Sequence, residues 1–260
     1  MTTRQLAPVN AGVRHRLDQV LVERGLCESR EKAKRAVMAG QVLVNGQPAC
    51  KPSDLIRPDD RLSLAAPERY VSRGGYKLEH ALRHFEIDVA GLTAIDLGAS
   101  TGGFTDCLLQ GGAAKVYAVD VGRGQLAWSL RRDPRVVVME QTNARHLTPG
   151  QFPPPFLPVD LVVVDCSFIS LRKILPAAVA LLRSSGRILA LIKPQFEAGK
   201  AEADKGAGVV RDAAVHERVL RDLQAFATEQ LLLHWRGTTE SPLLGPAGNK
   251  EFLVLIEKSG

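Results

Sequence analysis

Residues 94–104 read AIDLGASTGGF, and this stretch decides the fold. The apolar run Ala94–Leu97 predicts a buried β-strand, and the glycines after it predict a tight turn into a helix. Apolar strands and helices go on alternating to the end of the chain, which predicts a parallel sheet covered on both faces, a doubly wound α/β domain over residues 72–260. The expected strands are Ala94–Leu97, Val116–Asp120, Val136–Met139, Leu161–Asp165, Ile188–Lys193, Leu231–Trp235 and Phe252–Ile256.

The loop after the first strand is the expected cofactor site, because doubly wound sheets bind ligands beyond the carboxyl ends of their strands. Its glycines follow a G-x-x-x-G-G spacing, whereas dinucleotide sites use G-x-G-x-x-G, and the loop lacks the lysine of a phosphate-binding P-loop. Asp96 would place a carboxylate beside the ligand, which favours the cationic amino-acid portion of S-adenosylmethionine over a pyrophosphate. Asp120 ends the second strand, where it can take both ribose hydroxyls, and by itself it does not separate S-adenosylmethionine from NAD.

Before residue 72 the sequence predicts a small α+β unit. Residues 16–25 have helical spacing and end at a glycine, and Ser29 is a plausible N-cap for a second helix that stops at Gly40. A strand, an Asn45-Gly46 tight turn and a return strand follow. We expect a tail over residues 1–15, a small domain over 16–65 and a linker over 66–71.

Charge is unevenly distributed along the chain. The formal net charge is +6, and residues 1–69 hold twelve Lys/Arg against eight Asp/Glu, which accounts for +4 of it. A basic excess concentrated in one small unit favours an acidic partner such as nucleic acid, although a basic helix face can also be only a solvated surface. Charge alone favours the solvated surface; the residues that would contact a nucleic-acid partner are Arg16, Arg30, Lys32, Lys34 and Arg35.

Several classes of protein are excluded by composition. Apolar residues make up 45% of the chain and charged residues 24%, which is ordinary globular composition. No apolar run is long enough to span a membrane, and the first residues lack a secretory signal, so we expect a cytoplasmic protein with no membrane partner. The four cysteines show no metal-like spacing, so we expect free thiols and no metal site. We also expect a monomer.

Polar residues at the ends of predicted strands are candidates for chemistry. Lys77 starts a helix, Lys193 ends an apolar strand, and Glu251 opens the last strand. Asp165 ends the fourth strand and precedes Cys166, which leaves open a nucleophilic cysteine for methylation of a pyrimidine carbon. A small buried residue is the more economical interpretation of that thiol.

The order Lys77, Asp165, Lys193, Glu251 resembles the Lys-Asp-Lys-Glu set of the FtsJ-type ribose 2′-O-methyltransferases. The stretches SRGGYKL, DLGASTGGFTD, DCSFISL, LIKPQFEAGK and SPLLGPAGNKEF are similar to those of the TlyA or hemolysin A family of rRNA cytidine-2′-O-methyltransferases, over nearly the whole chain. The small unit resembles an RNA-binding domain first known from a small-subunit ribosomal protein. Cys166 and Gln141 depart from the family, which more usually has an aliphatic residue and an arginine there.

The resemblance implies a Rossmann-like methyltransferase domain that uses S-adenosylmethionine and acts on ribosomal RNA or a ribosomal subunit. A single cytidine of large-subunit rRNA is the expected target; an RNA pyrimidine C5-methyltransferase and a catalytically inactive ribosome-associated protein are the alternatives. The family's hemolysin name finds no physical support in the sequence. The expected catalytic residues are Lys77, Asp165, Lys193 and Glu251. The expected cofactor-binding residues are Asp96, Gly98, Ala99, Ser100, Gly102, Gly103, Phe104, Asp120, Val121 and Asn143.

Overall fold

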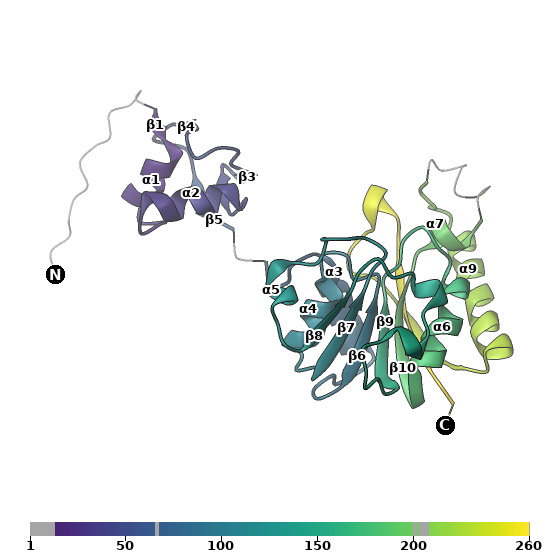
Figure 1. Ribbon diagram of the computed structural model, residues 1–260. Helices are drawn as coiled ribbons and strands as arrows, with labels where there is room; N and C mark the ends of the chain where they lie inside the picture. Colours follow the sequence, from purple (N-terminus) through teal and green to yellow (C-terminus); the bar gives the residue numbers. More distant parts are fainter. Residues whose placement is uncertain (1–13, 66–67, 200–201, 203–207, 260) are drawn as a thin grey trace. The chain divides into compact units, whose positions relative to one another are not determined.

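The computed structural model describes residues 14–65, 68–199, 202 and 208–259 (Figure 1). The chain forms two compact units, residues 1–69 and residues 70–260. Most of the expected N-terminal tail lies outside the described residues, as do residues 66–67 of the expected linker. Tyr70 is buried and packs within the second unit, where a Cβ on Gly75 would meet its ring at 2.2 Å. The packed part of the second unit therefore begins at Tyr70, before the helix that carries Lys77.

The first unit is a small α+β fold. Helices α1 (Leu17–Glu23) and α2 (Arg30–Met38) pack together, and Ser29 caps α2 by accepting a hydrogen bond from the Lys32 backbone. Strand β2 (Val42–Val44) pairs with β3 (Gln47–Pro48) and β5 (Leu62–Leu64), while β1 (His15–Arg16) pairs with β4 (Leu55–Ile56). Seven buried apolar side chains hold this unit together: Leu17, Val20, Leu21, Ala33, Val37, Val42 and Ile56.

The second unit contains a seven-stranded sheet in the order β11-β12-β10-β9-β6-β7-β8. Its strands are β6 (Thr93–Leu97), β7 (Lys115–Val119), β8 (Val136–Met139), β9 (Val159–Val164), β10 (Leu182–Ile192), β11 (His234–Glu240) and β12 (Phe252–Glu257). The expected doubly wound α/β class is confirmed. The expectation of a wholly parallel sheet is wrong in one place, because β12 runs antiparallel to both of its neighbours.

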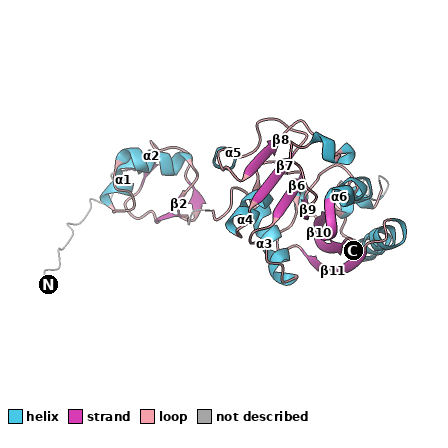
Figure 2. Cartoon of the chain, turned by 60° about the horizontal axis from the view of Figure 1, so that its bottom comes forward, coloured by secondary structure: helices cyan, strands magenta, loops and turns pink. Residues whose placement is uncertain are grey.

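Helices cover both faces of this sheet (Figures 1 and 2). On one face lie α3 (Gly74–His84), α4 (Gly103–Gln110) and α5 (Trp128–Arg131); on the other lie α6 (Leu175–Leu181), α7 (Pro194–Glu197) and α9 (Ala213–Ala225). Alternate side chains of each strand point to opposite faces of the sheet and belong to two separate hydrophobic cores. Ile95 and Leu97 pack towards α6, whereas Ala94 packs towards α4. Burial on both faces explains why these strands read as continuous apolar runs.

The sixth strand of this sheet begins later than the sequence predicts. Residues 231–235 were expected to form it because they are apolar, but β11 starts at His234 and runs through polar residues to Glu240. The helix before it continues as a π-turn over Phe226–Gln230, and the chain is still turning at Leu232, which has a φ of 54°. An edge strand contacts one neighbour only, so it does not require the apolar run that marks a central strand.

Among the described residues, no helix is both long and apolar enough to cross a membrane.

Candidate active site

The site lies where the winding of the sheet reverses. The chain goes from β6 to β7 and β8 on one side, then returns to β9 and β10 on the other, so the loops after β6 and β9 part at this point. Gly98, which follows β6, has a φ of +86°, and a Cβ there would lie 2.7 Å from the Asp165 carbonyl oxygen. Only glycine lets these two loops approach so closely.

Two adjoining cavities lie at the point where the loops after β6 and β9 separate. A chamber of about 570 Å³ is lined by Ser72, Arg73, Gly74, Lys77, Gly98, Ala99, Ser100, Thr101, Gly103, Phe104, Asp165, Ser167, Lys193 and Glu251. A slot of about 450 Å³ is lined by Gly98, Ser100, Val119, Asp120, Val121, Gln125, Thr142, Asn143, Ala144, Asp165, Cys166, Ser167, Phe168, Ile169 and Ile174. The two cavities share four lining residues: Gly98, Ser100, Asp165 and Ser167. A ligand in the slot therefore borders the chamber.

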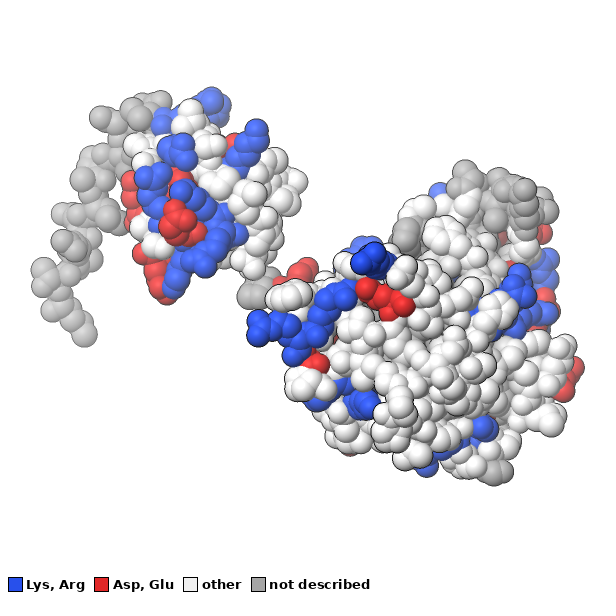
Figure 3. All heavy atoms as spheres, in the orientation of Figure 1, with Lys and Arg blue, Asp and Glu red and all other residues white. Residues whose placement is uncertain are grey.

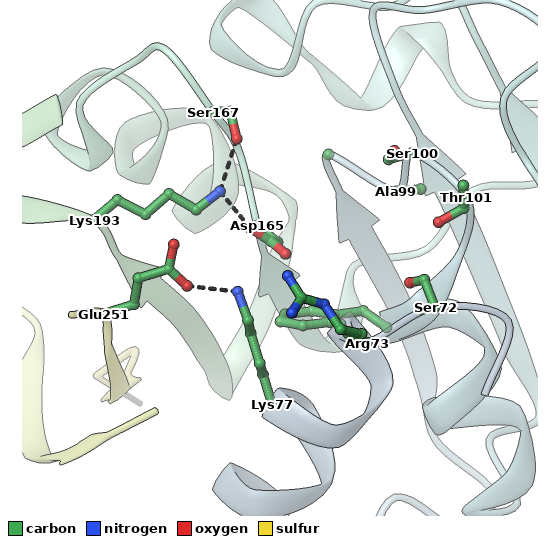
Figure 4. A pocket seen from close by; sticks show the side chains of 14 residues that line it. Ser72, Arg73, Lys77, Ala99, Ser100, Thr101, Asp165, Ser167, Lys193 and Glu251 are labelled. Carbon is green, nitrogen blue, oxygen red and sulfur yellow. Dashed lines mark hydrogen bonds and ion pairs between the residues drawn. The ribbon is translucent and has the colours of Figure 1, made fainter. Parts of the chain in front are cut away.

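Lys193 reaches the chamber from the end of β10 (Figure 4). Its Nζ lies 2.6 Å from Asp165 Oδ1 and donates a hydrogen bond to Ser167 Oγ at 2.8 Å. The Lys193 side chain is only 9% exposed. A lysine at the end of a strand usually extends into solvent. Lys193 points into the chamber instead, where Asp165 and Ser167 hold its amine.

Lys77 enters the same chamber from α3, and its Nζ donates to Glu251 Oε2 at 2.5 Å. The Glu251 side chain is completely buried, and that of Lys77 is 11% exposed. The structure thus brings together all four residues that the sequence singled out. Figure 4 shows Lys77 and Lys193 pointing towards a common space from different elements. The two lysines and the two carboxylates balance one another in formal charge, and Arg73 adds one further positive charge to the lining of the chamber.

The slot combines a carboxylate with apolar walls. Asp120 Oδ2 accepts a hydrogen bond from the Ser100 backbone at 2.8 Å, and Oδ1 accepts one from the Gly122 backbone at 2.7 Å. These bonds fix the carboxylate at the mouth of the slot and leave lone pairs free to accept from a ligand. The apolar wall includes Val121, which is 69% exposed, and Phe168, which is 89% exposed.

Two expected cofactor-binding residues do not line either cavity. Asp96 is completely buried beneath the glycine loop, where Oδ2 accepts from both the backbone and the hydroxyl of Thr105, at 2.9 and 2.7 Å. Burial raises the pKa of Asp96 to about 7. The Asp96 carboxylate therefore does not face either cavity; the carboxylates that line the slot are those of Asp165 and Asp120. Gly102 likewise faces Leu126 and Leu130 rather than a cavity.

Cys166 lines the slot with its thiol in an apolar setting. Its Sγ donates to the Leu97 carbonyl oxygen at 3.5 Å. Burial, reinforced by the neighbouring Asp165 carboxylate, raises the pKa of the thiol to about 12. Because the thiolate is the nucleophilic form, a thiol that stays protonated at neutral pH is poorly suited to attack a pyrimidine carbon.

The sequence analysis missed chamber residues that lie next to the ones it named. Ser72 and Arg73 directly precede α3, and Ser167 follows Cys166. The only sequence signal for these residues was that they lie within SRGGYKL and DCSFISL. Neither stretch predicts the direction in which the serine hydroxyl groups point. The bond between Ser167 and Lys193 became visible only in three dimensions.

Four of the five residues expected to bind RNA are paired with acids. Arg16 and Arg30 both bind Asp18, whose side chain is completely buried. Lys32 pairs with Glu28, and Lys34 with Glu31, on the exposed side of α2. Arg35 is exposed and forms no ion pair within residues 14–65. Figure 3 shows the result, a dense group of basic side chains over α1 and α2 interrupted by acidic ones.

Arg16 and Arg30 therefore have a structural task besides any contact with RNA. The Arg16 guanidinium, with help from Arg30, holds the pKa of the Asp18 carboxyl at about 2. Removing either arginine would leave a buried carboxylate short of a partner. The exposed pairs Lys32–Glu28 and Lys34–Glu31 carry no such penalty, because water solvates all four groups when the pairs open.

Within the described part of the chain, no three His, Cys, Asp or Glu side chains gather in a group that could hold a metal ion, and the four cysteines are free thiols.

A seven-stranded doubly wound sheet with one antiparallel strand, and with a glycine loop at its switch point, defines the Rossmann-like methyltransferase class. Residues 70–258 match the FtsJ-like methyltransferase family, and residues 15–62 match the S4 domain. The chain belongs to the FtsJ-like methyltransferase family, in the group that includes TlyA and hemolysin A. The resemblance inferred from the sequence is confirmed, and the protein is a methyltransferase with an N-terminal S4 domain.

Relatives match over most of the chain. The 16S/23S rRNA (cytidine-2′-O)-methyltransferase TlyA of Mycobacterium tuberculosis is 48% identical over 94% of this chain and 90% of its own length. Hemolysin A of Brachyspira hyodysenteriae is 41% identical over 92% of this chain and 98% of its own. The solved structure of a candidate hemolysin from Streptococcus thermophilus is 46% identical, with a TM-score of 0.72, and covers 96% of this chain and 90% of the other.

Proposed function

We propose that the protein transfers a methyl group from S-adenosylmethionine to the ribose 2′-hydroxyl of a cytidine in ribosomal RNA. The observation that carries this proposal is the meeting of two lysine–carboxylate pairs, of which only Asp165 is more than slightly exposed, at the edge of the slot beside the glycine loop. Relatives named as rRNA cytidine-2′-O-methyltransferases support the choice of substrate. Large-subunit rRNA is the proposed target.

The slot suits S-adenosylmethionine in size and chemistry. Its volume of about 450 Å³ lies in the range of small-ligand pockets. The fixed Asp120 carboxylate can accept from ribose hydroxyls, the apolar side chains around Val121 can hold an adenine ring, and Asp165 offers negative charge where the two cavities join. The bound cofactor would supply an activated methyl group on a sulfonium. A pyrophosphate would meet carboxylates in the same place.

The chamber supplies the groups that a ribose hydroxyl needs. A 2′-hydroxyl is a weak nucleophile and must lose its proton as its oxygen attacks the methyl carbon. A lysine ammonium has three N–H donors; Lys193 donates one to Ser167 and forms an ion pair with Asp165. Another N–H can hold the 2′-oxygen, and as the oxygen attacks, the hydroxyl proton can pass through the Lys193 amine to the Asp165 carboxylate, which accepts it. Lys77, oriented by Glu251, contributes a second positive charge as the alkoxide develops.

The two alternative functions fit the site less well. Methylation of a pyrimidine C5 requires a cysteine thiolate, and the pKa of Cys166 near 12 works against it. An inactive RNA-binding protein would have no need to place two lysine–carboxylate pairs in one chamber with three of the four side chains buried, because removing charges from water costs stability.

Mapping of 2′-O-methyl groups tests the proposal. Unmodified ribosomal subunits are incubated with the protein and S-adenosylmethionine, and every ribose methylation is located on both rRNAs. One new cytidine 2′-O-methyl group in large-subunit rRNA is expected. A methyl group on a base, or no methyl group at all, would contradict the proposal. A second methylated cytidine in small-subunit rRNA would extend the substrate range to both rRNAs.

Calorimetry tests the cofactor independently of RNA. S-adenosylmethionine should bind the protein, and NAD should not. Replacing Asp120 by Ala should weaken S-adenosylmethionine binding by about tenfold or more, since hydrogen bonds to a charged group contribute about 1.5–3 kcal/mol. Equal affinity in the variant, or tight NAD binding, would contradict the assignment of the slot.

A further inference from the structure

The carboxylate of Glu251 is held on two sides. Its Oε2 accepts a hydrogen bond from Lys77, and its Oε1 is buried, with no hydrogen-bond partner among the described residues. Oε1 lies instead against the backbone of Gly245, where a Cβ would stand 2.1 Å from it and 2.7 Å from the carboxyl carbon. No methyl group fits at residue 245 unless the carboxylate moves.

Backbone conformation does not explain the glycine at residue 245. Its φ of −68° and ψ of 176° are ordinary extended values that any L-residue adopts. The requirement for glycine therefore arises from the space that the Glu251 carboxylate occupies. This separates Gly245 from Gly98, whose positive φ would strain any other residue.

A closed turn fixes the distance between Gly245 and Glu251. The Gly245 N–H donates to the Asn249 carbonyl oxygen at 2.8 Å, and the Ser241 N–H donates to the Glu251 carbonyl oxygen at 2.9 Å. The turn links β11 to β12, so its position decides where the Glu251 side chain enters the chamber.

Asn249 fastens this turn to another part of the chain. Its side chain is 2% exposed, with Oδ1 accepting from the Val210 N–H and Nδ2 donating to the Gly208 carbonyl oxygen, both at 2.9 Å. Both ends of the carboxamide are thus paired with backbone groups. Buried polar groups that are fully paired specify one geometry, because any shift leaves a donor or an acceptor without a partner.

We propose that Gly245 and Asn249 are positioning residues for Lys77 and that they act through Glu251. Lys77 has a flexible four-carbon stem, and the direction of its amine is set by the carboxylate that it binds. That carboxylate is confined by Gly245, and Gly245 is held in a turn anchored by Asn249. The inference rests on the proposed function, because it assigns these residues to the orientation of a catalytic amine.

Gly245→Ala tests the confinement. Methyl transfer is measured at saturating S-adenosylmethionine and RNA, and both dissociation constants are measured separately. We expect kcat to fall about tenfold or more, with both dissociation constants within about twofold of the parent, since a displacement near 1 Å can cost about 10²-fold in rate. Gly150→Ala is the matched control, because a Cβ on Gly150 meets nothing within 4 Å, and it should keep the parent rate. A fully active Gly245→Ala variant would overturn the proposal, as would lost affinity with an unchanged kcat.

Glu251→Asp distinguishes two causes of a lower kcat in the Gly245→Ala variant: a clash with the Glu251 carboxylate, and a general distortion of the turn. Glu251→Asp withdraws the carboxylate by one methylene, so a methyl group at residue 245 then has room. The further loss caused by Gly245→Ala should shrink to less than about twofold in the Glu251→Asp protein. An equal loss in both backgrounds means that the contact is not the cause and overturns the proposal.

Melting temperatures make the contact testable without activity. Gly245→Ala should lower the melting temperature of the full chain, and this decrease should disappear when Glu251 is also replaced by Ala, because the clash is then gone. A decrease that persists contradicts the contact. This cycle also separates the two proposals: if the parent protein methylates no ribose, the proposed function fails, while the melting cycle still decides whether Gly245 confines Glu251.

Asn249 is tested by two variants. Asn249→Ala loses both hydrogen bonds, and Asn249→Asp keeps the oxygen that accepts from Val210 but turns a second oxygen towards the Gly208 carbonyl oxygen. We expect kcat to decrease in both variants, with S-adenosylmethionine affinity unchanged. An Asn249→Ala protein with the parent kcat would remove Asn249 from the proposal.

Discussion

Lysine–glutamate pairs occur in both units of this protein, and they differ in almost everything but composition. In the chamber, Lys77 and Glu251 are 11% and 0% exposed. On α2, Lys34 and Glu31 are 43% and 73% exposed. The buried pair cannot exchange its partner for water, whereas the exposed pair exchanges freely and contributes about 0–1 kcal/mol to stability. The first arrangement fixes an amine in space, and the second keeps an amine available for another anion.

This difference matches the two tasks of an RNA-modifying enzyme. Methyl transfer depends on placing a group within a fraction of an ångström of the reacting oxygen, and burial achieves this. Capture of RNA depends on mobile cations that exchange a carboxylate for a phosphate, and exposure allows this. The same side chain therefore serves chemistry or affinity according to its surroundings.

Removing a buried amine should have the largest effect. We expect Lys193→Ala to lower the rate of methyl transfer about 10²- to 10⁴-fold, which is the range for loss of a group that handles a proton in the transition state. S-adenosylmethionine and RNA affinities should stay within about twofold, because the lost interaction strengthens only as the oxygen attacks. Single-turnover transfer of labelled methyl to rRNA measures the rate.

Cys166→Ala is the control for this experiment. It removes a side chain that lines the slot beside Asp165 but bears no proton role in the proposed reaction. The variant should retain the parent rate within about threefold, since the high pKa of this thiol keeps it protonated. An active Lys193 variant beside a dead Cys166 variant would replace ribose methylation with methylation of a base carbon.

Removing exposed amines should have a smaller effect that depends on salt. We expect Lys32→Ala and Lys34→Ala each to weaken rRNA binding several-fold at low salt and each to reduce the slope of log affinity against log salt by about one unit. The rate at saturating RNA should not change. Arg221→Ala is the control, because Arg221 forms a similar exposed pair with Glu217 on α9 of the second unit. An unchanged slope in both lysine variants would mean that this face of α2 is only solvated.

Arg16 and Arg30 are poor choices for the same experiment. Both bind the buried Asp18, so their removal would weaken the first unit and lower RNA affinity indirectly. The sequence placed these two arginines in the same group as Lys32 and Lys34, because spacing along a helix does not show which cation has an acid behind it. This distinction required the structure.

Periodicity predicted the central strands well for a physical reason. Strands β6, β7 and β9 are covered on both faces, so nearly every residue is apolar and the run marks the strand. The edge strand β11 has one neighbour and carries polar residues, so its apolar flank at 231–233 was mistaken for it. The direction of β12 has no local signature, since an antiparallel and a parallel strand of equal burial read alike.

The sequence predicted which residues form the chamber, but not which of them bind one another. Lys77, Asp165, Lys193 and Glu251 stand out as charges beside apolar runs, and the structure places them in one chamber. Asp96 stands out equally and is buried beneath the loop, because a residue just before a strand end faces either the ligand or the core. Gly245 lies in the stretch SPLLGPAGNKEF but was not singled out, since the reason for a glycine there is a carboxylate six residues later in the chain.

The buried acid of the first unit leads to the smallest expected effect, on stability as a function of pH. Arg16 and Arg30 depress the pKa of Asp18 to about 2, below its ordinary value of 3.8. A depressed pKa means that the folded state favours the carboxylate, so the stabilisation is complete above about pH 4 and is lost as pH falls through about 2. Calorimetry of the full chain can follow this, whereas tryptophan fluorescence reports the second unit alone, because Trp128 and Trp235 both lie there.

Asp18→Asn removes this dependence. A depression of the pKa by about 1.8 units corresponds to about 2.5 kcal/mol. The asparagine oxygen still accepts from the arginines, so we expect a loss of about 1 kcal/mol at pH 7, which lowers the unfolding transition of the first unit by about 5 °C, and the difference from the parent should shrink as pH falls from about 4 towards 2. Glu28→Gln is the control: Glu28 is also paired with a lysine but is 82% exposed, so its transition should follow the parent at every pH. If the Asp18 variant keeps a constant offset from the parent down to pH 2, the carboxylate does not owe its ionisation to the two arginines. The contrast between buried and exposed pairs would then hold for the chamber and fail for the first unit.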